Sequence, residues 1–204
     1  MTTRHSVFAS AAYSFAALVR RIPDSAWEGP GLGAWSVRDL VGHTSRSLIT
    51  VSTYLKTPAQ RETAASAAEY YAAVREISSG MGEDAIVERG RQAGRELGAE
   101  PAAAVDALVA QVLADLDSAD DPLIEVIGGL GMRLSNYLPT RTFEMAVHGI
   151  DIARAVGIDF TPPADVLADA AALAAQIAVT LGQGTPVLLA LTGRAELPLG
   201  FSVV

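Results

Sequence analysis

The strongest constraint on the fold is a helix start written into the stretch WSVRDL. Ser36 is a favourable N-cap, and Asp39 three residues later completes a capping box with Asp in place of Glu or Gln. Trp35 and Leu40 occupy the two positions of a hydrophobic staple around this cap. These signals predict a helix that runs from Ser36 to about Lys56.

The rest of the chain reads largely as further helices. Apolar residues at helical spacing, or a proline at a helix start, predict helices over residues 3–21, 62–79, 83–97, 101–116, 135–156 and 163–181. In the fifth of these Ser135 is expected to be the cap and Pro139 to lie in about the first turn. Two short apolar runs around Gly128 and Gly129 predict a small hairpin, and residues 186–204 are expected to be extended or irregular. The sequence therefore predicts an all-α bundle with small additions.

Composition removes several classes of function. The chain of 204 residues carries a net charge of −8 and no cluster of Lys and Arg, so binding to nucleic acid is not expected. It contains no cysteine, which excludes disulfides, thiolate zinc sites and cysteine nucleophiles, so a reactive thiol has to come from outside. No apolar run reaches about 18 residues, and the first segment resembles an amphipathic helix more than a signal peptide. We expect a cytoplasmic protein with no membrane partner.

Three histidines are the main candidates for chemistry. His5 is expected to be solvated, His43 lies in the helix that begins at Ser36, and His148 lies four residues after Glu144. At 3.6 residues per turn Glu144 and His148 share one helix face. Either Glu144 pairs with Arg141 and His148 is a satisfied core histidine, or both side chains serve a site. If His43 meets them across the bundle, the three form a ligand set for a divalent metal, most plausibly Zn²⁺.

Two stretches resemble a known family. GLGAWSVRDLVGHTSRSL (31–48) looks like the second-helix motif of the mycothiol-dependent maleylpyruvate isomerase family, within the DinB-like superfamily. LSNYLPTRTFEMAVHGIDIARA (134–155) is similar to the second motif of that family, and residues 186–204 resemble the tails of its shorter relatives. The resemblance implies a DinB-like four-helix bundle, with extra short helices, that holds a metal on His43, Glu144 and His148. Residues 1–158 would form this metal-binding bundle, and residues 159–204 would form a C-terminal helix and tail packed on it.

The resemblance also implies a chemistry. A metal with an open position lowers the pKa of a bound thiol, so a thiolate becomes available at neutral pH. The implied activity is that of an S-transferase or isomerase in which mycothiol, the cosubstrate, attacks an electrophilic small molecule. The metal would be Zn²⁺, or another divalent ion such as Ni²⁺ or Fe²⁺. The isomerase of this family carries a further C-terminal domain after the metal-binding helix, whereas only about 45 residues follow that helix here. We therefore expect a substrate other than maleylpyruvate at least as much as maleylpyruvate itself.

Other readings stay open at this stage. The protein can be a non-catalytic metal-binding or stress-responsive bundle, or a helical protein that forms a homodimer. Asp39 and Asp151 can each orient a ligand imidazole, although helix capping accounts for Asp39. Arg141 can bind a substrate carboxylate or thiolate, or pair with an acid, and Tyr137 can line a pocket or pack in the core. No catalytic residue is assigned.

Overall fold

The computed structural model describes residues 3–79 and 83–204, and 66% of the chain is helical. The longer helices are α1 (Thr3–Val19), α2 (Val37–Tyr54), α3 (Ala67–Ser79), α4 (Glu83–Glu96), α5 (Pro101–Asp117), α6 (Leu134–Val156), α7 (Ala164–Thr180) and α8 (Gly184–Leu191). Two 3₁₀ turns, η1 (Asp24–Ala26) and η2 (Ile127–Gly129), and two short strands, β1 (Leu123–Val126) and β2 (Leu130–Arg133), complete the described elements.

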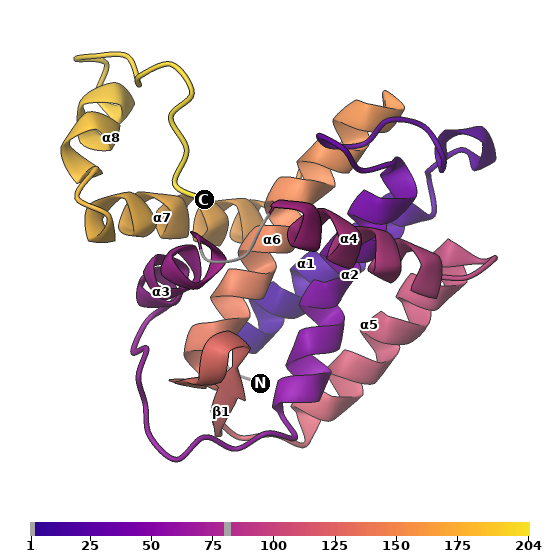
Figure 1. The fold of residues 1–204 in the computed structure, drawn as a ribbon, viewed down its shortest axis with the longest axis horizontal. Helices are drawn as coiled ribbons and strands as arrows, with labels where there is room; N and C mark the ends of the chain where they lie inside the picture. Colours follow the sequence, from indigo (N-terminus) through magenta and orange to yellow (C-terminus); the bar gives the residue numbers. More distant parts are fainter. Residues whose placement is uncertain (1–2, 80–82) are drawn as a thin grey trace.

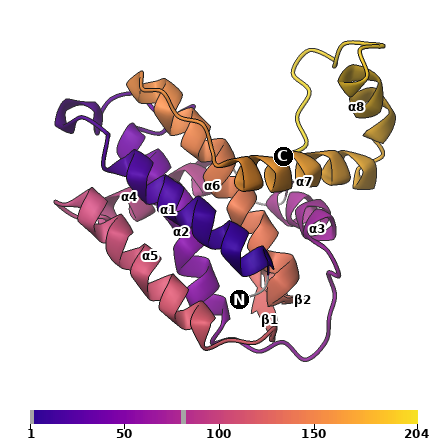
Figure 2. The ribbon, with the colours of Figure 1, turned by 180° about the vertical axis from the view of Figure 1, so that it is seen from behind.

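Four helices form the core of the molecule. α1 packs on α6 and α5, and α2 packs on the same two helices, which closes a ring of four neighbours (Figure 1; Figure 2 shows it from behind). Each contributes large apolar side chains that are almost completely buried, among them Phe8, Phe15, Leu40, Leu48, Val105, Val112, Met145 and Ile152. The all-α four-helix bundle predicted from the sequence is confirmed.

The start of α2 follows the sequence prediction closely. The backbone N–H of Ser36 donates to Oδ2 of Asp39 at 3.1 Å, and the backbone N–H of Asp39 donates to Oγ of Ser36 at 3.2 Å. Both halves of the capping box are therefore present. Asp39 is used as a helix cap, as its spacing from Ser36 predicted, and the helix ends at Tyr54, two residues earlier than expected.

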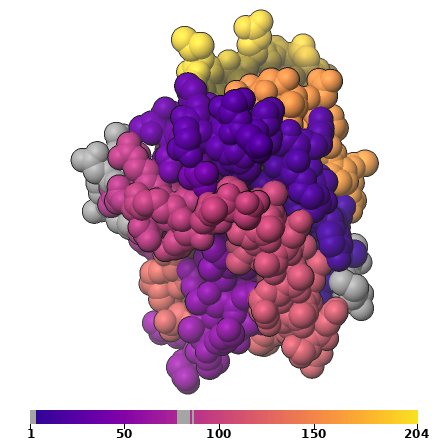
Figure 3. Space-filling view, turned by 90° about the vertical axis from the view of Figure 1, so that its right-hand side faces the viewer, coloured from indigo at the N-terminus to yellow at the C-terminus, as the bar shows by residue number. Residues whose placement is uncertain are grey.

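α4 crosses α2 at a contact between two glycines. A Cβ atom on Gly42 would lie 2.2 Å from the backbone nitrogen of Gly94, closer than any real side chain allows. The absence of a side chain at both positions lets the two backbones touch next to the histidine that follows Gly42. In Figure 3 the space-filling surface of α4 and α5 runs beside α2 on one face, and the C-terminal residues (yellow) project above it.

The hairpin predicted around Gly128 and Gly129 is present. β1 and β2 pair antiparallel, with Leu123 opposite Arg133 and Val126 opposite Leu130, and the turn uses a positive φ at both glycines. The loop that follows α2 lies along this hairpin, because backbone N–H groups at residues 59, 63 and 64 donate to its carbonyl groups. The hairpin thus ties the loop before α3 to the start of α6.

The start of α6 corrects one prediction. The helix begins at Leu134, and Ser135 lies inside its first turn instead of capping it. Asp121 takes the capping role, since its carboxylate accepts from both the backbone N–H of Ser135 at 2.7 Å and the Ser135 hydroxyl at 2.9 Å. Pro139 is the sixth residue of the helix and is buried, so it lies beyond the first turn. Pro139 has no N–H for the carbonyl of Ser135, which instead accepts from the guanidinium of Arg4 at 2.9 Å.

Two further predictions are wrong. His5 was expected in solvent, but it is only 7% exposed, because it shares with Phe8 and Ala12 the α1 face that packs into the bundle. The tail was expected to be extended or irregular from residue 186, but α8 covers Gly184–Leu191, with Pro186 in its first turn, where proline is tolerated. The predicted helix after Pro163 is confirmed as α7, which packs on α6, α3, α1 and α8.

Among the residues that the structure describes, no single helix is both long and apolar enough to cross a membrane. One pair of helical segments, Val87–Glu96 and Pro101–Asp117, meets the length and composition criteria only when taken together, and the two are bent by 94°.

Candidate metal centre

Three ionisable side chains meet where α2 faces α6. His43 comes from α2, and Glu144 and His148 come from successive turns of α6. Each of the three offers one ligand atom, and these atoms lie within 4.8 Å of one another. Spacing alone left the meeting of His43 with Glu144 and His148 open and the family resemblance implied it; the three side chains do meet in the fold.

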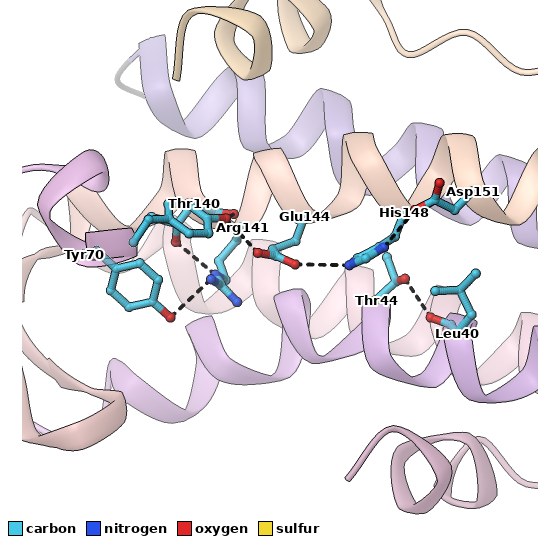
Figure 4. Close-up of polar contacts among 9 residues, drawn as sticks. Leu40, Thr44, Tyr70, Thr140, Arg141, Glu144, His148 and Asp151 are labelled. Atoms are coloured by element: carbon cyan, nitrogen blue, oxygen red, sulfur yellow. Dashed lines mark hydrogen bonds and ion pairs between the residues drawn. The ribbon is translucent and has the colours of Figure 1, made fainter. Parts of the chain in front are cut away.

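The α6 half of the cluster is held by hydrogen bonds. Nε2 of His148 lies 3.3 Å from Oε2 of Glu144, as the spacing of four residues allows. The hydroxyl of Tyr71, on α3, donates to Oε1 of the same carboxylate at 2.7 Å. On the other side of the imidazole, Nδ1 of His148 lies 3.2 Å from Oδ2 of Asp151 (Figure 4). With Nδ1 directed to Asp151, Nε2 faces the other two members of the cluster.

His43 is positioned by aromatic contacts. The Trp35 ring lies with its centroid 4.5 Å from that of His43 at an angle of 31°, and the His148 ring meets His43 edge-on at 5.0 Å. The Trp35 indole donates to the carbonyl of Val87 on α4 at 3.0 Å. Gly90 provides the space for this arrangement, since a Cβ there would lie 2.5 Å from the Trp35 ring. Trp35, expected as a staple residue, thus also supports His43.

Burial and neighbouring charges set the protonation of the cluster. Burial, together with His148 nearby, lowers the pKa of His43 to about 4. Burial would also lower the pKa of His148, but its bonds to Asp151 and Glu144 outweigh burial and raise that pKa to about 9. Burial opposes ionisation of Glu144, yet His148, Arg141 and Tyr71 hold its pKa well below the usual range. The cluster at neutral pH is therefore a neutral His43 beside a His148–Glu144 ion pair.

The sequence of this chain matches a known protein family. Residues 8–153, more than half of the chain, match the family model described as the mycothiol maleylpyruvate isomerase N-terminal domain. The chain belongs to this family, which lies within the DinB-like superfamily. Searches of curated proteins and of solved structures found no match. The matched region contains all three members of the cluster, so the family predicted from the two helical motifs is confirmed.

The donor set fits a divalent metal. Two imidazole nitrogens and one carboxylate oxygen suit Zn²⁺ and other first-row ions, and leave a position for a further ligand. Ligand atoms about 2.0–2.1 Å from a tetrahedral ion lie on the order of 3.3 Å apart, which is the separation of His148 and Glu144 here. His43 is already neutral and Glu144 is ionised, so only His148 has to lose a proton.

Arg141 does not pair with Glu144, although the sequence allowed it. Among the described side chains it forms no ion pair; its Nε donates to the Thr140 hydroxyl at 2.9 Å and its Nη2 to the Tyr70 hydroxyl at 3.3 Å. Its guanidinium carbon also lies 5.5 Å from the ring centre of Tyr70 and 5.0 Å from that of Tyr137. Figure 4 shows Arg141 between Tyr70 and Glu144. It is a cation held by neutral groups beside the cluster.

Tyr137 combines the two roles that the sequence left open. Its side chain is only 1% exposed and its hydroxyl donates to Thr50 at 2.9 Å, as expected of a core residue. It also lines a cavity of about 180 Å³ next to His43 and Glu144. A larger cavity of about 790 Å³ lies beside Glu144 and is closed on one side by residues 198–204. Glu144 therefore lines both cavities and His43 lines the smaller one, whereas His148 lines neither.

Sequence reasoning missed several residues that surround the cluster. Tyr71 bonds to Glu144, Tyr70 bonds to Arg141, and Arg46 lines the smaller cavity. The paired tyrosines in EYYAAVRE are the one visible signal in the sequence. Their partners lie on α6, about 70 residues later, and no local spacing indicates that contact.

Proposed function

We propose that this protein is a divalent-metal-dependent enzyme in which a low-molecular-weight thiol, mycothiol, attacks an electrophilic small molecule, as an S-transferase or isomerase. One observation carries the proposal: His43, Glu144 and His148 converge beside two cavities in a chain of the mycothiol maleylpyruvate isomerase family. The proposed metal is Zn²⁺, or another divalent ion such as Ni²⁺ or Fe²⁺.

The roles of the residues follow from their contacts. His43, Glu144 and His148 would hold the metal, which when bound lowers the pKa of a thiol and so supplies a nucleophile at neutral pH. Asp151 holds Nδ1 of His148, which directs Nε2 toward the centre. Tyr71 fixes one oxygen of Glu144, which leaves the other oxygen on the His148 side.

The chain also provides the surroundings for a small substrate. Val74, Pro186, Leu199, Phe201 and Val203 make much of the larger cavity apolar, and such a surface excludes water from the bound electrophile. We propose that residues 1–158 form the metal-binding bundle and that residues 159–204 complete the wall of its cavity. We further propose that the enzyme acts in the cytoplasm on small molecules, without nucleic acid or membrane, alone or as a homodimer.

A non-catalytic metal-binding or stress-responsive bundle is the competing function. A site sealed from solvent would favour it, whereas His43 and Glu144 both line a cavity and Glu144 lines two. The cavities therefore favour an enzyme over a non-catalytic metal-binding bundle.

The decisive experiment is metal analysis followed by an activity assay. Purified protein should contain about one divalent ion per chain and should consume electrophiles only when mycothiol is present. Stripping the metal should abolish turnover and adding it back should restore turnover, which separates loss of metal from loss of folding. His148→Ala should lose both metal and activity; a His148→Ala enzyme that lacks metal but turns over normally would rule out the mechanism.

A further inference from the structure

The smaller cavity has an unusual concentration of positive charge. Arg46 from α2, Arg89 from α4 and Arg141 from α6 all line its volume of about 180 Å³. Glu144 is the one carboxylate among the cavity-lining residues that the structure describes, and it belongs to the candidate metal centre. The chain as a whole carries a charge of −8, so three arginines around one small space run against the overall balance.

Arg141 is the first feature that indicates a site for an anion in this cavity. Its guanidinium has five N–H donors, and its two hydrogen bonds go to the neutral hydroxyls of Thr140 and Tyr70. No carboxylate lies within ion-pair distance of it among the side chains that the structure describes. The Glu144 carboxylate also acts on Arg141 electrostatically, but it is already paired with His148, so this partly buried cation keeps an attraction for a further negative group.

Arg46 is the second such feature. It lies three residues after His43 and therefore on the same face of α2. Its side chain is partly buried, and within the described part of the chain its guanidinium makes no hydrogen bond and no ion pair. Two guanidinium groups from facing helices thus have donors to spare at one cavity.

The size and position of the cavity indicate what it takes. A cavity of about 150 Å³ is known to hold benzene, so about 180 Å³ accommodates a carboxylate and a few attached carbons but not a large ligand. Tyr71, Val74 and Glu144 line both this cavity and the larger, mostly apolar one. The two cavities therefore adjoin at these side chains, so a ligand with its charged end in the first has the apolar second cavity beside it, next to Glu144 of the candidate metal centre.

We propose that the cavity lined by Arg46, Arg89 and Arg141 is an anion subsite that binds a carboxylate, so that the substrate is a carboxylic acid with an apolar body. The planar fork of a guanidinium matches the two oxygens of a carboxylate, which explains arginine at all three positions. That the bound acid is the substrate rests on the proposed function, whereas the binding of a carboxylate in this cavity does not. In that arrangement the larger cavity holds the aliphatic or aromatic part of the molecule.

The test uses trans-cinnamate and its uncharged isostere trans-cinnamamide, titrated calorimetrically into the full-length protein without mycothiol. The metal-loaded and the metal-stripped protein should both bind cinnamate at least about tenfold more tightly than cinnamamide, because a charge-assisted bond is lost with the carboxylate. Raising the salt from about 0.05 to 0.5 M should weaken cinnamate binding and leave cinnamamide unaffected.

Arg46→Gln should reduce cinnamate affinity about tenfold or more, Arg46→Lys should recover part of it, and Arg154→Gln should leave it unchanged. Arg154 is an exposed arginine of α6 outside both cavities, so it controls for the loss of one charge. Equal binding of acid and amide by the unaltered protein, or no binding of cinnamate at millimolar concentration, would overturn the proposal whatever the variants do. A protein that binds cinnamate through Arg46 but turns over no electrophile would refute the proposed enzyme and leave the carboxylate subsite standing.

Discussion

Replacing Tyr71 with Phe should weaken zinc binding without disturbing the bundle. The change removes one hydroxyl and keeps the ring, which packs edge-on against Phe143 at 5.5 Å. The lost hydrogen bond joins the Tyr71 hydroxyl to Oε1 of Glu144 at 2.7 Å, a short distance typical of a bond to a charged acceptor. The hydroxyl also lies 3.2 Å from the carbonyl of Thr140, but its single proton favours the nearer, charged carboxylate.

The size of the effect follows from this bond. A hydrogen bond to a charged group contributes about 1.5–3 kcal/mol, and loss of a partner that orients a metal ligand lowers metal affinity about 10–100-fold. Tyr71 is 8% exposed, so little water can reach Glu144 from that side to replace the hydroxyl. We expect Tyr71→Phe to bind zinc about 10–100-fold more weakly than the unaltered protein.

Competition with a chromogenic zinc chelator at neutral pH measures this affinity. The matched control is Tyr13→Phe, which removes the same hydroxyl from a side chain of α1 that is 61% exposed and lines neither cavity. The control should bind zinc as the unaltered protein does. If Tyr71→Phe and Tyr13→Phe are indistinguishable, Tyr71 does not orient Glu144 and the assigned role is wrong.

Three further predictions concern stability, each read from urea unfolding. In the metal-free protein, the bonds of His148 to Asp151 and Glu144 raise its pKa from 6.5 to about 9. These bonds should therefore stabilise the fold fully below pH 6.5, and on the order of 3 kcal/mol should be lost as the pH rises through 9; a flat profile there would contradict this. Asp39→Ala removes half of the capping box and should cost about 1 kcal/mol, whereas no change would show that Ser36 suffices. Gly42→Ala forces a methyl group against Gly94 and should cost about 1–3 kcal/mol, unless α4 can move away from α2.

The features that the sequence predicted correctly depend on neighbours within one or two turns. The capping box of Ser36 and Asp39, the paired glycines of the hairpin and the shared face of Glu144 and His148 each involve residues at most a few positions apart. Over such distances backbone geometry fixes which side chains meet, so spacing alone is informative. The helices predicted on this basis are present, with their ends displaced by a few residues.

The features that the sequence missed depend on how distant segments pack. Local spacing did not show that His43 meets α6, because the ring of four helices decides this; the prediction that it does came from the family resemblance. His5 looked like a solvated terminal residue, but its place on the α1 face that carries Phe8 buries it. The apolar run in α8 is too short for its periodicity to distinguish a helix from an extended segment.

The surroundings of the cluster explain how a bundle core tolerates ionisable side chains at all. A buried charge without a partner is costly, and the structure gives each of these charges a counterpart: Glu144 has His148 and Tyr71, and His148 also has Asp151. In the metal-free protein a proton on His148 supplies the positive charge that a divalent ion would otherwise bring. The three candidate ligands are therefore held near one another without a metal, so folding and not metal binding orders them. Binding of a divalent ion would then replace the proton on His148, while the donors of Arg141 beside the cluster would stay available to the proposed carboxylate.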